Sequence, residues 1–275
     1  MDRRLTPANG RVAALNLKGK IDAEVFTDGE LLQVHAPTTT IWRDACEETP
    51  DRELLFGDVF RVLEELDGFA FGQAEKDGYC GYVRAGDLSQ VTTSTHFVAV
   101  RSTHLYNGPG IKTPRSMALS FASRLTIAEV HEKFAVTTDG HYVPITHIRE
   151  LGSVFSDPVE VAEIFLGTPY LWGGNSGFGL DCSALVQVSL MACGVPCPGD
   201  SDMQERSLGA PLGDAEPTRR GDLFFWKGHV AIAADAERII HANAHRMSVN
   251  YERIDMALPR IEAAGDGPVT SRRRV

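Results

Sequence analysis

The residues of this 275-residue chain that have the types and spacing for covalent chemistry are one cysteine and two histidines. Cys182 follows Asp181 directly after a glycine-rich turn, at the start of an apolar run typical of a helix. Unpaired backbone N–H groups and the positive end of the helix dipole favour an anion at such a position. Because the thiolate is the nucleophilic form of cysteine, the pattern indicates a nucleophilic thiol.

A thiol with an unperturbed pKa of about 8.5 needs a base nearby or a lowered pKa to react at neutral pH. His229 and His241 lie in two successive predicted strands and are equally distant from Asp235. A hairpin centred on Asp235 places the two histidines opposite each other and on one face of the sheet. If the helix that begins at Cys182 packs with its first turn over that face, the three side chains form a nucleophile, a base and a group that orients the base.

Asp181 has two opposite effects on this arrangement. As a favoured N-cap residue, it stabilises the start of the helix. Its carboxylate, however, lies beside Cys182 and disfavours the thiolate. Either a histidine outweighs this charge, or Asp181 binds a cationic group.

Other uses of these residues stay open. A lone cysteine is often a packing residue, and a histidine on a strand is often a surface or satisfied core residue. The turn from Gly173 to Gly179 lacks the sequence patterns of a phosphate-binding loop. Cys193 and Cys197 have a spacing that can serve zinc, but no second Cys/His pair completes four ligands nearby. We therefore expect neither a metal nor a cofactor.

The elements that must position these groups form a C-terminal domain, residues 151–275. Asp157 as N-cap and Pro158 as first helical residue begin one helix. A second helix, from Cys182 to about Cys193, is apolar almost all round and is therefore expected to be buried. The rest of the domain is predicted to be β, with strands at 222–226, 229–234, 238–243 and 247–251.

Ahead of this domain the sequence repeats itself. A valine with an apolar-aromatic pair seven and eight residues later occurs at Val34 and again at Val98. A Tyr-Val pair before a last strand occurs at Tyr82 and again at Tyr142, and an Asp-Gly turn precedes each. Since both offsets are about sixty residues, two tandem β modules are predicted. They follow an N-terminal extension, so the predicted segments are 1–30, 31–92 and 93–150.

Composition limits the partners and the compartment. The chain is 43% hydrophobic and 23% charged, as in ordinary globular proteins, and 27 basic against 37 acidic residues give a net charge of −10. We therefore expect neither nucleic acid nor a membrane surface as a partner. No apolar run approaches the roughly 20 residues of a membrane span, and residues 1–20 lack a signal-peptide pattern. Five scattered cysteines do not make a disulfide framework. A cytoplasmic protein with a frayed basic tail at Arg272–Arg274 is expected.

Several motifs resemble those of the NlpC-type bacterial cell-wall peptidases, which are papain-like thiol enzymes. They are Tyr170-x-Trp172-Gly173-Gly174, Asp181-Cys182-Ser183, Arg220-Gly221-Asp222-Leu223-Phe224-Phe225, Gly228-His229-Val230-Ala231-Ile232 and Ile240-His241-Ala242. The tandem modules look like the bacterial SH3-like domains of the subgroup that cleaves small murein peptides, the γ-D-glutamyl-L-diamino acid endopeptidases of dipeptidyl-peptidase VI type. The resemblance implies an α+β protein, with a papain-like catalytic domain preceded by two small SH3-like β-barrels.

The resemblance also implies a reaction. It is hydrolysis of the bond between γ-D-glutamate and diaminopimelate, in murein tripeptides or tetrapeptides with a free N-terminal L-alanine, during cell-wall recycling. Cys182 would attack the γ-carbonyl, His229 would move the proton and His241 would orient His229. The backbone N–H of Cys182, helped by Tyr170, would hold the oxyanion.

Further residues match family positions that contact the substrate, chiefly at its amino end. The resemblance implies this role for Asp181, Ser183, Trp172, Tyr79 and Asp58. Pairing with a substrate ammonium would explain why a carboxylate lies beside the thiol. Asp58 stands where relatives usually carry glutamate, so Tyr79 and Asp58 can also be read as ordinary barrel residues.

Two other functions stay open at this point. The same acyl-enzyme could serve a thiol amidase or an acyl transferase, and a catalytically silent domain would leave a protein that binds murein fragments. The sequence does not distinguish diaminopimelate from lysine at the third substrate position, and it does not give the oligomeric state.

Overall fold

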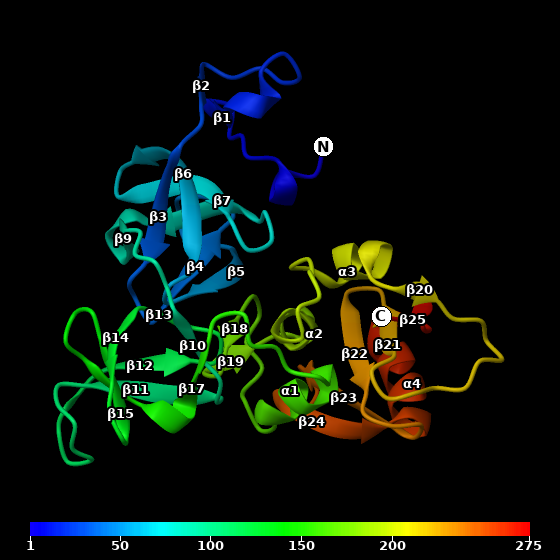
Figure 1. Ribbon diagram of the computed structural model, residues 1–275. Helices are drawn as coiled ribbons and strands as arrows, with labels where there is room; N and C mark the ends of the chain where they lie inside the picture. The colour runs from blue at the N-terminus through cyan, green and yellow to red at the C-terminus, as the bar shows by residue number, and fades with distance from the viewer. The chain divides into compact units, whose positions relative to one another are not determined.

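The computed structural model describes residues 1–275. The chain divides into two compact units, Met1–Ser153 and Val154–Val275 (Figure 1). Each unit has its own sheets and its own buried core. No helix in either unit is both long and apolar enough to cross a bilayer.

The N-terminal unit begins with a small two-stranded parallel sheet, β1 (Val12–Ala14) with β2 (Val25–Thr27). A seven-stranded antiparallel sheet follows, in the order β5-β4-β8-β7-β6-β3-β9. Its strands are β3 (Glu30–Val34), β4 (Thr38–Trp42), β5 (Pro50–Leu55), β6 (Val59–Leu66), β7 (Phe69–Ala74), β8 (Cys80–Arg84) and β9 (Leu88–Gln90).

The rest of this unit holds two further antiparallel sheets, in the orders β12-β11-β16-β15-β14 and β13-β10-β17. Their strands are β10 (His96–Val98), β11 (Ser102–Tyr106), β12 (Arg115–Ser120), β13 (Arg124–Leu125), β14 (Ile127–Val130), β15 (Phe134–Thr137), β16 (Tyr142–Pro144) and β17 (Ile148–Glu150). All of these ladders are linear, so their hydrogen bonds do not close into complete rings.

The sequence repeat is also a structural repeat. β8 is followed by a 3₁₀ turn, Ala85–Asp87, and then β9, and β16 is followed by the turn Ile145–His147 and then β17. Trp42 of β4 pairs with Tyr82 of β8, as Tyr106 of β11 pairs with Tyr142 of β16. The two copies thus place their matching aromatic residues in matching strand pairs. The exact limits of the modules stay a prediction.

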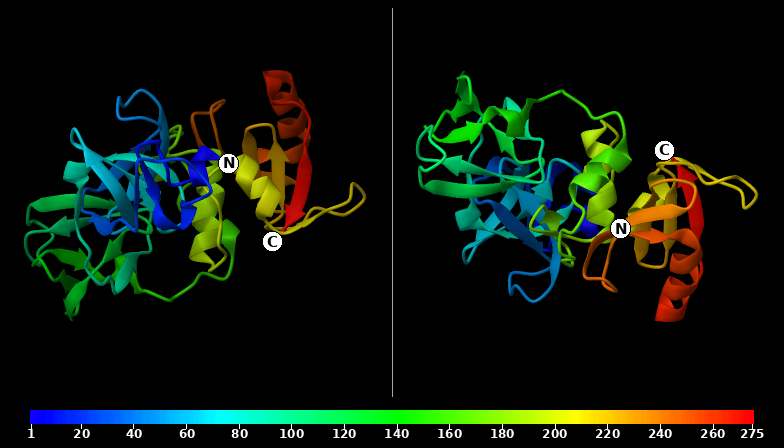
Figure 2. Two further views of the ribbon diagram at one scale, coloured as in Figure 1. Left: turned by 90° about the horizontal axis from the view of Figure 1, so that it is seen from above. Right: turned by 90° about the horizontal axis from the view of Figure 1, so that it is seen from below.

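The C-terminal unit is built on a six-stranded sheet in the order β20-β25-β21-β22-β23-β24. Its strands are β20 (Ala210–Pro211), β21 (Leu223–Trp226), β22 (His229–Ala233), β23 (Arg238–Asn243), β24 (Ser248–Arg253) and β25 (Ser271–Arg274), and a short hairpin joins β18 (Asn175–Ser176) to β19 (Gly179–Leu180). The helices are α1 (Pro158–Ile164), α2 (Cys182–Ala192), α3 (Ser201–Ser207) and α4 (Ile254–Ile261). Helices α1 and α2 lie on one side of this sheet and α4 on the other (Figures 1 and 2).

Helices α1 and α2 form as their sequences predict. Asp157 caps α1 by accepting a hydrogen bond from the Val159 N–H, and Pro158 occupies the first turn, where its missing N–H costs nothing. In α2 every residue from Cys182 to Leu190 is buried. The two helices pack on each other, and α2 also packs on β22 and β23. The first turn of α2 is therefore held between fixed elements.

The C-terminal arginines are not a frayed tail, and that prediction is wrong. Ser271–Arg274 forms β25, which pairs with β21 on one side and β20 on the other. Arg274 makes two 2.7 Å contacts with the carboxylate of Asp222, and Arg272 donates to the backbone carbonyls of Gly213 and Glu216. The arginines are accommodated because acceptors meet each of them at the sheet.

Helices α3 and α4 were not predicted, because the domain after α2 was expected to contain only strands. Both are short, and α4 carries Pro259 in its interior, a residue that normally marks a helix end. Ala257 and Ile261 of α4 pack against a buried cluster on the sheet. The members of this cluster on β21, β22 and β23 are Phe224, Trp226, Ala231, Ala233 and Ile239. Tertiary packing thus outweighs the weak local signal.

Candidate active site

The start of α2 is fixed by the carboxylate of Asp181. It accepts hydrogen bonds from the Ala184 N–H at 2.8 Å, the Ser183 hydroxyl at 2.8 Å and the Gly173 N–H at 3.1 Å. Asp181 is therefore the N-cap that the sequence predicts. The third contact also ties the glycine turn to the helix, so the turn and Cys182 keep a fixed relation.

The glycine turn needs its glycines for space. A Cβ on Gly174 would lie 2.6 Å from the carbonyl oxygen of Gly179, and a Cβ on Gly179 would lie 2.8 Å from the Leu171 Cβ. At the start of the turn, the Tyr170 N–H donates to the Met247 carbonyl at 2.9 Å. The turn is thus packed against the loop that follows β23, and Tyr170 is held at this edge of the domain.

The two histidines form a hydrogen-bonded pair. His229 Nε2 lies 2.9 Å from His241 Nδ1, with the ring centroids 5.1 Å apart. His241 Nε2 in turn lies 3.1 Å from a carboxylate oxygen of Glu252. Arg260 holds that carboxylate with two hydrogen bonds, at 2.7 and 2.6 Å. The side chain of His241 is completely buried, so its ring orientation is fixed by these neighbours.

The strand register corrects one expectation about the histidines. The hairpin pairs Ile232 with Ile240 and Ala233 with Ile239, so it is centred on Ala236 and not on Asp235. His229 and His241 are therefore diagonal neighbours instead of directly opposed residues. They still share one face, because this register differs from the expected one by two residues and side chains alternate with period two.

Helix α2 does not lie over the face that carries the histidines. His229 pairs with Trp226, so both point to the side covered by α4. Cys182 instead approaches the histidine end of β22, since the backbone of Val230, the residue after His229, is among the groups that lower the pKa of its thiol. The thiol therefore lies beside the start of β22, the strand that begins with His229.

The electrostatics around Cys182 oppose a thiolate, although the start of a helix favours one. Burial, and then the charge of Asp181, raises the pKa of Cys182 to about 12, although backbone hydrogen bonds from Val230 and Ser183 oppose this. Burial, and then His241, lowers the pKa of His229 to about 3. At neutral pH the resting pair is a neutral thiol and a neutral imidazole. Such an imidazole is a free base that can accept the thiol proton during attack.

Tyr170 has the properties of a hydrogen-bond donor beside the thiol. Burial raises the pKa of its hydroxyl, and the nearby Cys182 and Asp181 raise it further. The hydroxyl therefore stays protonated over the physiological range. A neutral donor beside the attacking sulfur suits the stabilisation of an oxyanion.

The other predicted substrate residues differ in their surroundings. Ser183 is buried and donates to Asp181, whereas Trp172 is 65% exposed beside the glycine turn. Tyr79 and Asp58 belong to the N-terminal unit. Tyr79 is 2% exposed, and the Asp58 carboxylate accepts a hydrogen bond from the Leu55 N–H and forms a 2.7 Å ion pair with Lys76. Both therefore have roles within their own domain, and their contact with substrate stays a prediction.

Glu252 and Arg260 were missed by sequence reasoning. The predicted last strand stopped at Tyr251, one residue short of Glu252, and Arg260 lies in the unpredicted helix α4. The carboxylate could have been found from the strand pairing, because Ile239 of β23 pairs with Glu252 of β24. This pairing places Glu252 on the face of Ile239, and therefore on the face of His241.

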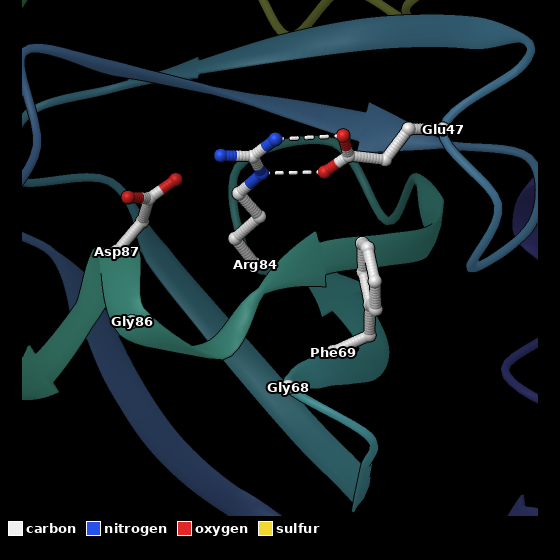
Figure 3. A pocket seen from close by; sticks show the side chains of 6 residues that line it. All are labelled: Glu47, Gly68, Phe69, Arg84, Gly86 and Asp87. Carbon is white, nitrogen blue, oxygen red and sulfur yellow. Dashed lines mark hydrogen bonds and ion pairs between the residues drawn. The ribbon is translucent and has the colours of Figure 1, made fainter.

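A hollow lies in the N-terminal unit and is lined by none of the predicted site residues. Figure 3 shows the six residues that line it: Glu47, Gly68, Phe69, Arg84, Gly86 and Asp87. Arg84 and Glu47 face each other in a two-bond ion pair, and Asp87 accepts a 2.6 Å hydrogen bond from the Thr39 hydroxyl. Its charged groups thus meet partners inside the protein. No cluster of three or more His, Cys, Asp or Glu side chains is arranged to bind a metal ion anywhere in the chain.

Comparisons with known proteins identify relatives of both units. Residues 167–262 match the model of the NlpC/P60 family, and residues 43–88 match that of the bacterial dipeptidyl-peptidase Sh3 domain. Dipeptidyl-peptidase 6 of Lysinibacillus sphaericus is 24% identical over 233 residues, which are 75% of this chain and 85% of that protein. Gamma-D-glutamyl-L-lysine dipeptidyl-peptidase of Bacillus subtilis is 30% identical over 187 residues, which are 60% of each chain.

Solved structures show the same fold. An NlpC/P60 family protein from Bacillus cereus superposes with a TM-score of 0.74 at 18% sequence identity, covering 89% of this chain and 99% of that one. An NlpC/P60 endopeptidase from Photobacterium damselae gives a TM-score of 0.58 at 13% identity, covering 94% and 74%. At such identities the likeness concerns the fold alone.

A buried cysteine at a helix start and a histidine pair on the neighbouring sheet, in an α+β domain that follows SH3-like modules, define a papain-like cysteine peptidase. The chain combines an NlpC/P60 domain, matched over residues 167–262, with an SH3 domain of the bacterial dipeptidyl-peptidase type, matched over residues 43–88. The resemblance read from the sequence motifs is thereby confirmed.

Proposed function

We propose that this peptidase hydrolyses the bond between γ-D-glutamate and diaminopimelate in murein tripeptides or tetrapeptides with a free N-terminal L-alanine. The observation that carries the proposal is that Cys182, at the start of α2, is close enough to the backbone of Val230 for that backbone to lower the pKa of the thiol, and Val230 directly follows His229, which is hydrogen-bonded to His241. The names of two relatives, one of them a gamma-D-glutamyl-L-lysine dipeptidyl-peptidase, support the substrate class.

In the proposed reaction Cys182 is the nucleophile and His229 the base. The sulfur attacks the γ-carbonyl carbon while the thiol proton passes to His229, and the oxyanion is held by the Cys182 N–H and the Tyr170 hydroxyl. The C–N bond then breaks, and His229 returns the proton to the leaving amine. Water hydrolyses the thioester, which releases the dipeptide and restores the thiol. His241 orients His229 throughout.

Five residues are proposed to bind the substrate. Asp181 supplies the negative charge for the substrate ammonium, and Ser183 and Trp172 line the same part of the catalytic domain. Tyr79 and Asp58 contribute from the N-terminal unit. Asp58 already forms an ion pair with Lys76. Its substitution is therefore expected to weaken substrate binding less than substitution of Asp181.

We place this activity in the recycling of wall fragments in the cytoplasm. All five cysteines are free thiols, which agrees with a reducing compartment. Cell fractionation with an antibody to the chain tests the location. Recovery outside the cytoplasmic fraction would contradict it.

The direct test is incubation with L-Ala-γ-D-Glu-diaminopimelate under reducing conditions. Release of L-Ala-γ-D-Glu is expected from the wild-type chain and not from Cys182→Ala. The same peptide with lysine in third place decides between the two diamino acids. Absence of dipeptide release from both peptides would falsify the proposal, and transfer of the acyl group to an added amine faster than to water would favour an acyl transferase.

A further inference from the structure

The histidine pair does not end at His241. The second imidazole nitrogen of His241, Nε2, lies 3.1 Å from Glu252 on β24, and Glu252 is held by Arg260 on α4. Three separate elements, β22, β23 and β24, thus contribute one member each to a continuous row of hydrogen-bonding groups. An arginine from a fourth element closes the row.

The carboxylate decides which nitrogen of His241 carries the proton. An ionised carboxylate only accepts hydrogen bonds, so Nε2 of His241 must be the donor. In a neutral imidazole the other nitrogen, Nδ1, is then an acceptor. Since Nδ1 of His241 lies 2.9 Å from Nε2 of His229, the proton of that contact belongs to His229.

The same reasoning fixes His229. With its proton on Nε2, its Nδ1 carries the lone pair and is the only nitrogen that can accept a proton from a thiol. A neutral chain of two histidines would otherwise have two tautomeric arrangements. The carboxylate at one end allows only the arrangement with both protons on Nε2, in which Nδ1 of His229 can accept a proton.

The charges around the row agree with an ionised Glu252. Burial opposes ionisation, but hydrogen bonds from Arg260 and His241 outweigh it and lower the pKa of Glu252 to about 2. The charged groups that act on the two histidines are Glu252, Arg260 and, near His241, His245. Arg260 also acts against a positive charge on either histidine, so Glu252 neutralises a cation that would otherwise weaken the base.

We infer that Glu252, held by Arg260, is a positioning residue that sets the tautomer of His241 and thereby leaves Nδ1 of His229 free to take the proton of Cys182. This inference rests on the proposed roles of Cys182 and His229. It adds a fourth and a fifth residue to the three that the sequence motifs supply.

The test replaces the carboxylate without changing its shape. For Glu252→Gln we expect kcat for the murein tripeptide to fall at least about tenfold, with KM within about twofold, because orientation of the base is lost while binding is kept. Alkylation of Cys182 by iodoacetamide at neutral pH, located by peptide mass mapping, is expected to slow by a similar factor. A kcat within twofold of wild type would overturn the inference.

Glu163→Gln is the matched control. Glu163 is also a partly buried carboxylate of the same unit with an arginine neighbour, but it accepts from the Tyr251 hydroxyl and touches no histidine. Its substitution is expected to leave kcat and alkylation unchanged. Equal losses in Glu163→Gln and Glu252→Gln would show a general effect on the fold and would contradict a positioning role.

The double variant Glu252→Gln with Arg260→Gln separates orientation from charge. It removes the cation that the single variant leaves unpaired, so its thermal stability is expected to be closer to that of wild type. If kcat remains low in the double variant, the result supports orientation of the histidines by Glu252. If kcat returns to the wild-type value, Glu252 only neutralises Arg260, and the inference fails.

The tautomers themselves can be read by ¹⁵N NMR of the labelled histidines in wild-type protein. We expect His241 protonated on Nε2 and not on Nδ1, and His229 likewise. This measurement does not depend on any substrate. A wild-type chain with these tautomers but no peptide cleavage would contradict the proposed function alone, whereas a proton on Nδ1 of His241 would contradict the inference alone.

Discussion

At the scale of single residues, the site combines a neutral thiol with a neutral imidazole. Cys182 is buried beside Asp181 and holds its proton, and His229 is buried beside His241 and stays neutral. A substrate ammonium that pairs with Asp181 would remove much of the field that opposes the thiolate. Asp181 can thus serve the fold as a helix cap and, in the proposed mechanism, couple binding of the free amine to activation of the sulfur.

The substitution Asp181→Asn tests that coupling. Asparagine is an equally good N-cap, so α2 should keep its start, while loss of the negative charge lowers the pKa of Cys182. We expect alkylation of Cys182 to become faster at a given pH, and the preference for free over acetylated N-termini to shrink. The pH profile of alkylation and the KM for both peptides check these effects.

Asp235→Asn is a suitable control for this pair of measurements. Asp235 accepts from backbone N–H groups of its own turn and pairs with Arg238, and it does not act on the thiol. An unchanged alkylation profile in Asp181→Asn would show that burial alone sets the pKa of Cys182. An unchanged peptide preference would return Asp181 to the role of a helix cap only.

At the scale of elements, the sequence predicts what local patterns encode. The caps Asp157 and Asp181 and the apolar run after Cys182 are local signals, so α1 and α2 were predicted close to their true bounds. The common face of His229 and His241 was also predicted, since period-two alternation survives a two-residue shift. The register itself was not, because the turn sequence around Asp235 does not distinguish a centre there from one at Ala236.

Elements that depend on distant partners were missed. Strand β25 is a run of arginines without apolar alternation, and it exists because β21 and β20 offer it backbone partners and Asp222 offers it a counter-charge. The same limit explains Glu252, whose importance comes from a histidine on the neighbouring strand. The residues adjacent in sequence indicate neither the strand partners of β25 nor the histidine that Glu252 contacts.

The substitution Arg274→Met tests the role of β25. It leaves the Asp222 carboxylate, which is 1% exposed, without its ion-pair partner, although Asp222 still accepts from the Arg219 N–H. We expect the free energy of unfolding of the C-terminal unit to fall by about 1–3 kcal/mol. Chemical denaturation followed by far-UV circular dichroism measures this loss.

Arg206→Met is the control for that loss. Arg206 also pairs with an aspartate, Asp202, but both side chains are largely exposed on α3. Its removal is expected to cost no more than about 0.5 kcal/mol. Equal effects of the two substitutions would contradict a structural role of β25 beyond that of an ordinary surface strand.

At the scale of the whole molecule, the two units differ in the kind of groups they bury. The N-terminal unit carries repeated β modules with mainly apolar cores, such as the cluster around Val98 and Leu119. The C-terminal unit buries a row of titratable groups, and the proposed mechanism needs one of them, His229, as a neutral imidazole next to the thiol. The units are therefore expected to respond differently to acid.

Stability in acid tests this difference. Burial depresses the folded-state pKa of both His229 and His241. Their contribution to the free energy of unfolding is therefore fully present above the unfolded-state pKa of about 6.5. It is lost as the pH falls toward the folded-state pKa, which is about 3 for His229. Glu252, with a pKa lowered to about 2, adds a further loss below its ordinary value of 4.5. At about 1.4 kcal/mol per pKa unit, a loss on the order of a few kcal/mol is expected.

Hydrogen exchange of the full chain at pH 7 and pH 5, resolved by peptide, measures that loss in each unit separately. Protection is expected to fall mainly in residues 154–275. The N-terminal unit should change less, because its one histidine with a lowered pKa, His147, is only half-buried. In His241→Gln the pH dependence should be shallower, since one of the two buried histidines no longer titrates. An equal loss of protection in both units, or an unaltered slope in His241→Gln, would mean that the histidine row does not determine the response to acid.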